Sequence, residues 1–384
     1  MKHFLLSLIA FLCVSALSAQ SRIIYETFYS AKMDQDRKLK IQLPRDYEAN
    51  TEKVYPIVVV LDGNYLFEPV AGNVDYFSYW EDMPESLVVG IMQGDQRYDD
   101  CDYDDTTFFP SDTGSKFFEF IGMELIQYLD ENYRTAQFVI GVGHDFTANF
   151  LNYYLFKDPP LLNGYINLSP DLAPLMDERL PERIPAIESK TFYYLATGTD
   201  DVKDLQEISK GLHERLNPLE SENFSYYFDN FEGATHYSLV SHGIPNALEK
   251  IFSVYRPISK SEFNDVVMKL ETPVNEYLKE KYKTIEELFG LSNPIRINDF
   301  IAVATAAEKK SQWEALRDIA TMAQRQYPDT VLGDYYLARF YEETGEPKKA
   351  MRTYQGGFDK EEVEFITVDL MLDRADRIKE DFGF

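Results

Sequence analysis

The sequence predicts an α/β protein that continues into an all-helical C-terminal region. Short apolar runs alternate with stretches of helical periodicity from about residue 22 to residue 257. After residue 261 the apolar runs cease, and helical periodicity continues to residue 384. Alternating strands and helices are typical of a mainly parallel sheet with helices on both faces. We therefore expect an α/β domain over residues 22–257 and a helical region over residues 261–384, joined near Arg256–Lys260.

Five apolar runs are the expected strands. Each is short and almost continuously apolar, which is typical of strands that are buried on both faces. They are residues 57–61, 87–91, 138–142, 164–168 and 192–196. Apolar residues at helical spacing between the strands predict helices within residues 117–129, 149–156 and 247–252.

The composition narrows the classes of function. The chain has 384 residues, with 38 basic and 65 acidic side chains, and its formal net charge is −27. An acidic surface repels phosphate backbones and anionic lipids, which argues against nucleic-acid binding and against a basic membrane-binding patch. Two cysteines cannot form a disulfide framework or a Cys-rich zinc site. We expect no cofactor and no metal ion.

The first residues predict export. Lys2 and His3 precede an apolar run from Phe4 to Val14, and small residues follow up to Ala19. This pattern is typical of a secretory signal peptide, here residues 1–19, and the run is too short to span a bilayer. We expect cleavage near Ala19 and a periplasmic or outer-membrane-associated location in a Gram-negative bacterium, with no transmembrane segment.

The segment Val142–Thr147 has the pattern of a strand–turn–helix elbow. Gly143 and Thr147 are the small residues two positions before and after Asp145, and an apolar strand precedes the turn. In α/β-hydrolases this elbow presents a nucleophilic serine on a strained turn. Here the central residue is Asp145, and aspartate is among the few non-glycine residues that tolerate a positive φ. The elbow can therefore form without a serine.

With this elbow and further motifs, the chain resembles the bacterial esterase family that includes esterase D and the ferric-enterochelin esterases. The resemblance runs from about Val54 to Val254 and rests on motifs in the family's order. These motifs are Tyr55–Gly63, Val88–Ile91, Tyr133-Arg134, Gly143–Phe146 and Leu168–Pro170. It implies an α/β-hydrolase fold. In the family the elbow reads Gly-His-Ser-Phe-Gly-Gly, so this chain departs at the nucleophile and at both trailing glycines.

The resemblance also implies the remaining site residues. Gly233–Ser238 matches the family's histidine segment and makes His236 the general base. Thr197–Asp201 matches the loop with the orienting acid, for which Asp201 is the first candidate and Asp200 the second. Backbone N–H groups at three positions would form the oxyanion hole. These positions are Gly63, Asn64 and Phe146.

Three interpretations of Asp145 remain open. In the favoured one the hydrolase is catalytically inactive, and Asp145 accepts hydrogen bonds from His236 and from nearby backbone groups. In the second, Asp145 is itself the nucleophile, as in haloalkane dehalogenases and epoxide hydrolases. Those enzymes need a cap domain, for which the 55 positions between Asp145 and Asp200 leave no room. The third is a metal site. We also expect Thr147 and Ala148 to crowd the elbow, so that Asp145→Ser alone would not restore full activity.

Residues 95–105 contain the densest group of acidic side chains. In the family this loop lies beside the site entrance and carries an arginine, here Arg97. Asp100, Asp102 and Asp104 have the alternate spacing of a calcium loop, but the glycine and glutamate expected further along are absent. We favour an acidic, partner-facing rim, formed with Arg97, over a calcium site.

The helical region resembles a tetratricopeptide repeat. Tyr335–Gly345 leads through the turn Gly345–Pro347 to Ala350 and Tyr354 with the spacing of that repeat. A single clear repeat rarely folds alone, so we expect it to pack on another surface. The favoured function is a catalytically degenerate esterase-like binding or scaffold component of a cell-envelope complex, with a protein partner that has a basic docking surface. The alternative is an active hydrolase of carboxylic or siderophore esters, or one that uses Asp145.

Overall fold

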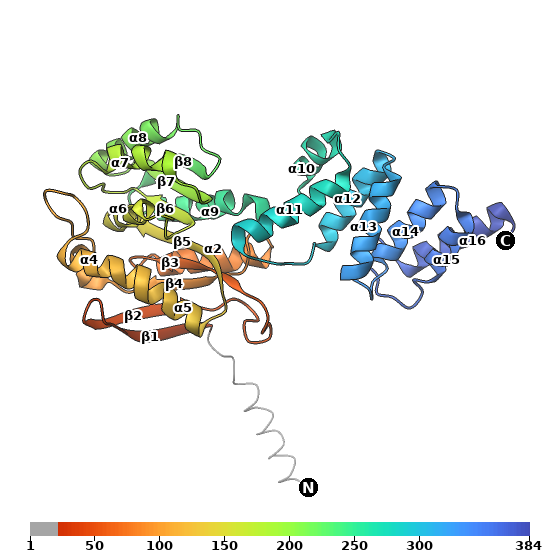
Figure 1. The fold of residues 1–384 in the computed structure, drawn as a ribbon, viewed down its shortest axis with the longest axis horizontal. Helices are drawn as coiled ribbons and strands as arrows, with labels where there is room; N and C mark the ends of the chain where they lie inside the picture. The colour runs from red at the N-terminus through yellow and green to blue at the C-terminus, as the bar shows by residue number, and fades with distance from the viewer. Residues whose placement is uncertain (1–21) are drawn as a thin grey trace, which may run out of the picture. The chain divides into compact units, whose positions relative to one another are not determined.

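The computed structural model describes residues 22–384, so the expected signal peptide lies outside the described residues. The chain forms two compact units, with the boundary between Phe252 and Ser253 (Figure 1). The first unit is a mixed α/β structure, and the second is all-helical over residues 253–384. Both expectations for the fold class are confirmed.

The first unit is built on an eight-stranded sheet with the strand order β1-β2-β4-β3-β5-β6-β7-β8 within the described residues. Strands β3 to β8 run parallel, and β1 and β2 form an antiparallel extension that pairs with β4. The strands are β1 (Ile23–Ser30), β2 (Gln35–Gln42), β3 (Tyr55–Val60), β4 (Leu87–Ile91), β5 (Thr135–His144), β6 (Gly164–Leu168), β7 (Thr191–Asp200) and β8 (Phe224–Thr235). The five expected strands correspond to β3–β7.

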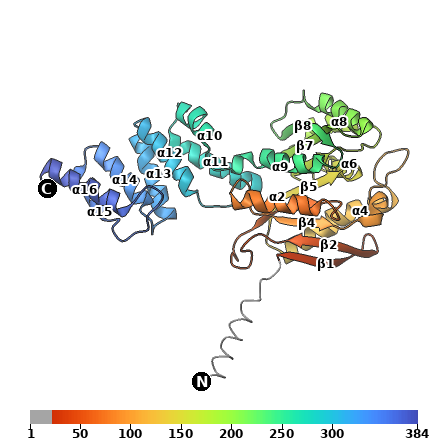
Figure 2. The same ribbon diagram turned by 180° about the vertical axis from the view of Figure 1, so that it is seen from behind.

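Helices cover both faces of this sheet. Alternate residues of β3, such as Ile57 and Val59, join the apolar core that Phe117, Leu151 and Leu212 fill from the helices on one face. On the other face α2 and α9 contact each other, and they lie in front of the sheet in Figure 2. The helices are α2 (Phe67–Tyr79), α3 (Arg97–Asp100), α4 (Asp112–Glu119), α5 (Ile126–Asn132), α6 (Phe146–Asn152), α7 (Met176–Arg183), α8 (Lys203–Leu216) and α9 (Leu239–Ile251).

One expected helix has an irregular centre. The helix expected over residues 117–129 is divided into α4, a π-helical segment at Phe120–Leu125, and α5. The extra residue in each π-turn lets Phe117, Phe120 and Leu125 all remain buried in the same core.

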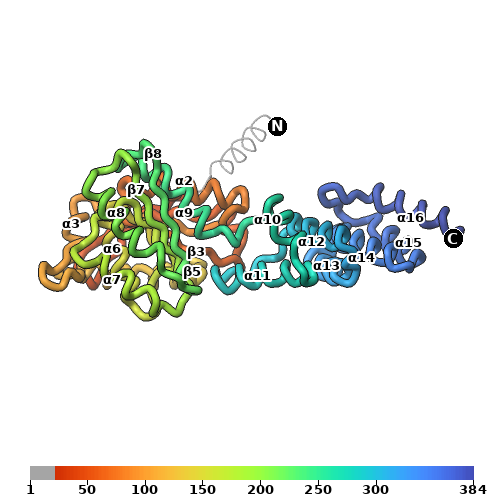
Figure 3. Tube along the Cα trace, turned by 90° about the horizontal axis from the view of Figure 1, so that it is seen from above, coloured from red at the N-terminus to blue at the C-terminus, as the bar shows by residue number. Residues whose placement is uncertain are grey.

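The second unit consists of successive helices that pack against their neighbours in the chain (Figure 3). Its core includes Phe300, Leu316, Tyr336 and Tyr354, all of which are buried. The helices are α10 (Lys260–Asp265), α11 (Val274–Phe289), α12 (Ile297–Lys309), α13 (Trp313–Gln326), α14 (Leu332–Glu343), α15 (Pro347–Gln355) and α16 (Val368–Phe382). Across residues 22–384, no helix is both long enough and apolar enough to cross a membrane.

Candidate functional site

Asp145 lies at the tip of a strained turn between β5 and α6. Its φ is 63° and its ψ is −122°, and its N–H donates to the Leu168 carbonyl of the neighbouring strand across 3.0 Å. A Cβ on Gly143 would come within 2.6 Å of the Thr147 backbone, so glycine is required there. A positive φ costs a non-glycine residue about 1–2 kcal/mol, and such strain is characteristic of functional turns. The segment therefore has the backbone of a nucleophile elbow with a carboxylate at its tip.

His236 forms a dyad with Asp201. His236 Nδ1 lies 2.9 Å from Asp201 Oδ1, and the Asp201 side chain is fully buried. The Val202 N–H and the Thr197 hydroxyl donate to the two Asp201 oxygens across 2.7 and 3.1 Å. Burial opposes ionisation, but hydrogen bonding from His236, Ser169 and the Val202 N–H, led by that from His236, holds the pKa of Asp201 below its usual value. An ionised Asp201 fixes the Nδ1–H tautomer, which leaves His236 Nε2 as a base.

The structure distinguishes the two candidate acids. Asp200 pairs with Thr235 in the sheet and is exposed, whereas Asp201 is the residue beside His236.

Arg97, rather than His236, binds the Asp145 side chain. Arg97 Nη2 donates to Asp145 Oδ2 across 3.2 Å and to the His144 carbonyl across 3.0 Å. Its Nε donates to Asp62 Oδ1 across 2.8 Å. Burial disfavours the guanidinium charge, but Asp62 and the other nearby acidic groups outweigh this effect and raise the pKa of Arg97. Among the described residues Asp145 and His236 share no hydrogen bond, so the expected bond between them is wrong.

Asp62 is a site residue that sequence reasoning missed. It lies just beyond the end of β3 with a φ of 53°, and its side chain is 3% exposed. Burial raises its pKa, although Arg97 opposes this effect. The Thr147 hydroxyl donates to Asp62 Oδ2 across 2.8 Å, so this buried threonine packs against Asp62. Thr147 and Ala148 are both buried within the elbow, and the expectation that they crowd it stays a prediction. A carboxylate just after a parallel strand was a usable signal for Asp62, because ligand sites form at that edge of such sheets.

His144 contacts the His236 residue of the dyad. It is buried, and its ring lies against that of His236 with the centroids 4.2 Å apart. Burial and the neighbouring His236 lower the pKa of His144 to about 3, so the ring is neutral at pH 7. Its Nε2–H donates to the His236 carbonyl across 3.1 Å, and its Nδ1 lies 3.1 Å from the Tyr65 hydroxyl, which donates to Asp62. His144 thus holds His236 in place.

The three positions expected to form the oxyanion hole differ in their bonding. The Gly63 N–H donates to the Ile91 carbonyl across 2.8 Å and is not available to a ligand. The N–H groups of Asn64 and Phe146 have no hydrogen-bond partner among the described residues. At most two of the three expected donors can therefore face a bound oxygen.

The acidic loop is not a continuous rim. Asp100 is fully buried in an ion pair with Arg37, and Gln93 Nε2 also donates to it across 3.0 Å. Its assignment to the rim is therefore wrong. Asp102 and Asp104 are exposed, and Asp104 accepts the backbone N–H groups of its own turn.

The same burial argues against the calcium loop. Because Asp100 is paired with Arg37, its carboxylate is not available beside Asp102 and Asp104. In the described chain, no group of three or more His, Cys, Asp or Glu side chains is placed to hold a metal ion.

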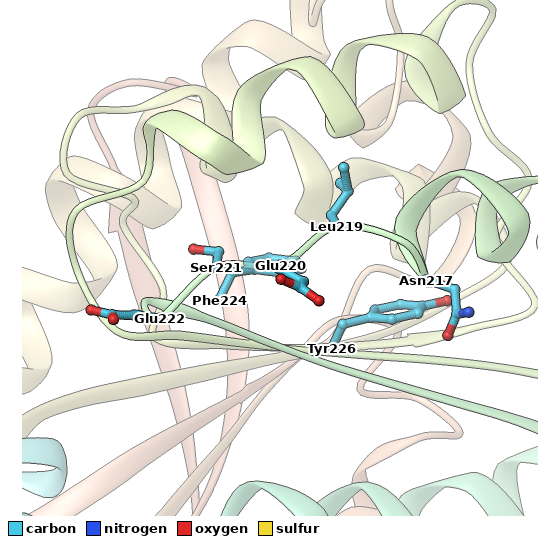
Figure 4. Close-up of a pocket in the computed structure, with 7 residues that line it drawn as sticks. All are labelled: Asn217, Leu219, Glu220, Ser221, Glu222, Phe224 and Tyr226. Carbon is cyan, nitrogen blue, oxygen red and sulfur yellow. The ribbon is translucent and has the colours of Figure 1, made fainter.

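A separate pocket of about 510 Å³ lies between the end of α8 and the start of β8 (Figure 4). It is lined by Asn217, Leu219, Glu220, Ser221, Glu222, Phe224 and Tyr226. His236 follows the other end of β8, a strand of 12 residues whose start lines the pocket. This pocket is therefore distinct from the site at the elbow.

Comparison with known proteins relates both units to a solved structure. A protein of Capnocytophaga ochracea, described as uncharacterised, is 30% identical and has a TM-score of 0.84. The alignment covers 93% of this chain and 99% of that protein. The chain belongs to the family of this Capnocytophaga protein. The shared architecture therefore includes the helical unit as well as the α/β unit.

More distant similarities concern the esterase-like part. Residues 30–144 match the profile of the family described as "Putative esterase". An IroE-like serine hydrolase of Shewanella oneidensis is 18% identical with a TM-score of 0.60, over 79% of this chain and 99% of that protein. The BES protein of Bacillus cereus is 20% identical with a TM-score of 0.52, over 60% of this chain and 96% of that protein. At these identities the two structures show the fold alone. No curated protein matches the chain.

Proposed function

We propose that this member of the Capnocytophaga protein's family is a catalytically degenerate esterase-like protein that acts by binding in a cell-envelope complex. The observation that carries the proposal is the hydrogen bond between Arg97 and Asp145 at the tip of the elbow. Ester hydrolysis on this fold needs a hydroxyl there, activated by the histidine. A carboxylate held by a guanidinium cannot form the usual acyl-enzyme.

The competing function is hydrolysis with Asp145 as the nucleophile. The retained dyad of His236 and Asp201 favours it, because such enzymes use the histidine to activate water against the covalent ester. Two observations oppose it. Arg97 pairs with the would-be nucleophile, and β6, α7 and β7 occupy the stretch in which a cap domain would be inserted.

The helical unit supports the binding role in this proposal. Helices α14 and α15 pack as a hairpin, and Gly345 in the turn between them has a φ of 79°. We assign this hairpin to the tetratricopeptide type, whose stacked helices present surfaces to partner proteins. The signal-peptide pattern of residues 1–19 supports export, and thus a partner in the periplasm or at the outer membrane.

Two measurements test the proposal. Purified protein of residues 20–384 is expected to show no turnover of short-chain p-nitrophenyl esters above that of His236→Ala. Affinity purification from native membranes is expected to recover a partner at fixed stoichiometry. Recovery of the protein alone, together with ester turnover that His236→Ala abolishes, would overturn the binding role in favour of catalysis.

A further inference from the structure

Large apolar side chains are exposed around the elbow. Strands β3, β4, β6, β7 and β8 are parallel, so the loops after their C-terminal ends share one edge of the sheet with Asp145. Each of these loops exposes a large apolar side chain. They are Tyr65, Tyr98, Leu175, Val202 and Tyr237, which we call the apolar ring. Tyr237, directly after His236, is 81% exposed. Single exposed apolar residues are ordinary, but several around one site indicate an interaction surface.

Two of these tyrosines, Tyr65 and Tyr98, contact residues of the elbow site directly. The Tyr65 hydroxyl lies 3.0 Å from Asp62 Oδ2, and the Tyr98 ring packs edge-on against Phe146 with the centroids 5.3 Å apart. The Arg97 guanidinium lies over the rings of Tyr98 and Phe146 at 5.8 and 5.3 Å. The apolar ring and the charged residues of the elbow therefore form one continuous surface.

The charged residues inside this ring are predominantly acidic. Asp171 lies next to Asp145, since its N–H donates to the Asp145 carbonyl across 3.2 Å. Its half-buried carboxylate has no hydrogen-bond or ion-pair partner within residues 22–384. Burial and the nearby Asp145 raise the pKa of Asp171. Arg97 is shared between Asp62 and Asp145, so three carboxylates are balanced by one guanidinium.

We propose that the apolar ring and the carboxylates of Asp145 and Asp171 receive an arginine or lysine side chain presented by a protein partner. This inference rests on the proposed binding function and names the chemistry of the partner. A guanidinium or ammonium group would compensate the unpaired carboxylate with charge-assisted hydrogen bonds. Tyr65, Tyr98 and Tyr237 offer ring faces to the cation and apolar surface to its aliphatic stem.

The acidic charge of the site also disfavours anionic ligands. A carboxylate or phosphate ligand would be repelled by Asp145 and Asp171, and Arg97 already donates from Nε to Asp62 and from Nη2 to Asp145 and the His144 carbonyl. A charged anchor surrounded by aromatic side chains is a common arrangement at the centre of protein interfaces. A basic side chain on an apolar partner surface satisfies both parts of this site.

The test is calorimetric titration of the full chain with a defined peptide, acetyl-Gly-Leu-Arg-Leu-Gly-amide. We expect saturable binding at least tenfold tighter than that of the same peptide with citrulline, which keeps the shape of arginine without its charge. The double variant Asp145→Asn/Asp171→Asn is expected to weaken binding at least tenfold, and Tyr237→Ser severalfold. Asparagine also tolerates the positive φ of position 145, and thermal unfolding verifies that each variant is folded.

Two matched variants serve as controls. Glu52 is an exposed acid just before β3, at the opposite edge of the sheet, and Tyr76 is an exposed tyrosine on α2. Glu52→Gln and Tyr76→Ser are expected to bind the arginine peptide as the unchanged chain does.

Three results would overturn the inference: no saturable binding, equal binding of the citrulline peptide, or undiminished binding by the double variant. The ester assay separates this outcome from failure of the proposed function. If the peptide does not bind and esters are not hydrolysed, the partner chemistry is wrong while the non-catalytic role stands. Ester hydrolysis that depends on His236 defeats the non-catalytic role whether or not the peptide binds.

Discussion

Arg97 and Asp145 are joined by a hydrogen bond of 3.2 Å that links the loop after β4 to the tip of the elbow. In a serine hydrolase the residue at this tip faces the catalytic histidine. Here the Asp145 carboxylate is bound to Arg97, while His236 keeps its own bond to Asp201. The dyad of His236 and Asp201 is therefore formed while the elbow carries no hydroxyl, and the following predictions depend on that arrangement.

Asp145→Ser is expected to give measurable but incomplete hydrolysis of p-nitrophenyl acetate. The elbow backbone and the dyad are already in place, and the Thr147 hydroxyl is bonded to the buried Asp62. General-base assistance contributes about 10²- to 10⁴-fold. The engaged Gly63 N–H limits the recovery, because it removes one oxyanion donor. The control is Asp145→Ser/His236→Ala; turnover equal in both variants would show that the dyad does not act on the new serine.

Arg97→Gln is expected to destabilise the fold by about 3–5 kcal/mol, because it leaves the buried Asp62 carboxylate without its cation. Urea unfolding measures the loss. The matched control is Arg22→Gln, whose pair with Asp75 is partly exposed and worth about 1 kcal/mol or less. Addition of Asp62→Asn to Arg97→Gln should recover part of the loss. Equal effects of Arg97→Gln and Arg22→Gln would contradict the role given to Asp62.

His144 is expected to make stability fall as the pH falls from about 6.5 towards 3. Its pKa is lowered from 6.5 to about 3 in the folded protein, so below pH 6.5 the unfolded chain binds a proton that the folded chain does not. The contribution of neutral His144 to the free energy of unfolding is fully present above pH 6.5. Between pH 6.5 and pH 3 it is lost at roughly 1.4 kcal/mol per pH unit. The measurement is the pH dependence of the unfolding free energy of the unchanged chain compared with His144→Gln. Parallel curves for the two proteins would refute the prediction.

Two glycine-to-alanine substitutions are expected to change the stability of the fold in opposite directions. Gly345 has a φ of 79° in the turn between α14 and α15, where alanine costs about 1 kcal/mol. Gly211 lies within α8, and a Cβ there would meet nothing within 4 Å, so alanine should stabilise by about 0.5–1 kcal/mol. Differential scanning calorimetry of both variants checks the signs. Destabilisation by Gly211→Ala would contradict the finding that the space around a Cβ at this position is open.

The strands that the sequence predicted are those whose burial on both faces gives a continuous apolar run in the sequence. Strands β3 to β7 are buried on both faces, so their residues are almost continuously apolar. β1 is an edge strand, β2 lies between it and β4, and both alternate polar with apolar residues. β8, at the other edge, carries many half-buried polar and aromatic side chains. An alternating or mixed pattern of this kind gives a weaker signal, which is why these three strands were not anticipated.

The sequence by itself determined the α/β class and the elbow at Asp145, because strand burial and tight turns are local properties. Its resemblance to the esterase family supplied the candidates His236 and Asp201, with Asp200 as the second choice for the acid. Only the tertiary structure decided which partner each charged side chain has. Arg97 lies 48 positions from Asp145 and 35 from Asp62, and Arg37 lies 63 positions from Asp100. The two Arg97 pairs form because the parallel strands bring the segments that follow them to one edge, where a buried charge must find a partner. Arg37 instead lies on the antiparallel strand β2 and reaches Asp100 at the end of α3. The composition shows only that the chain is acidic; the fold decides which carboxylates are paired and leaves Asp171 without a partner within the described residues.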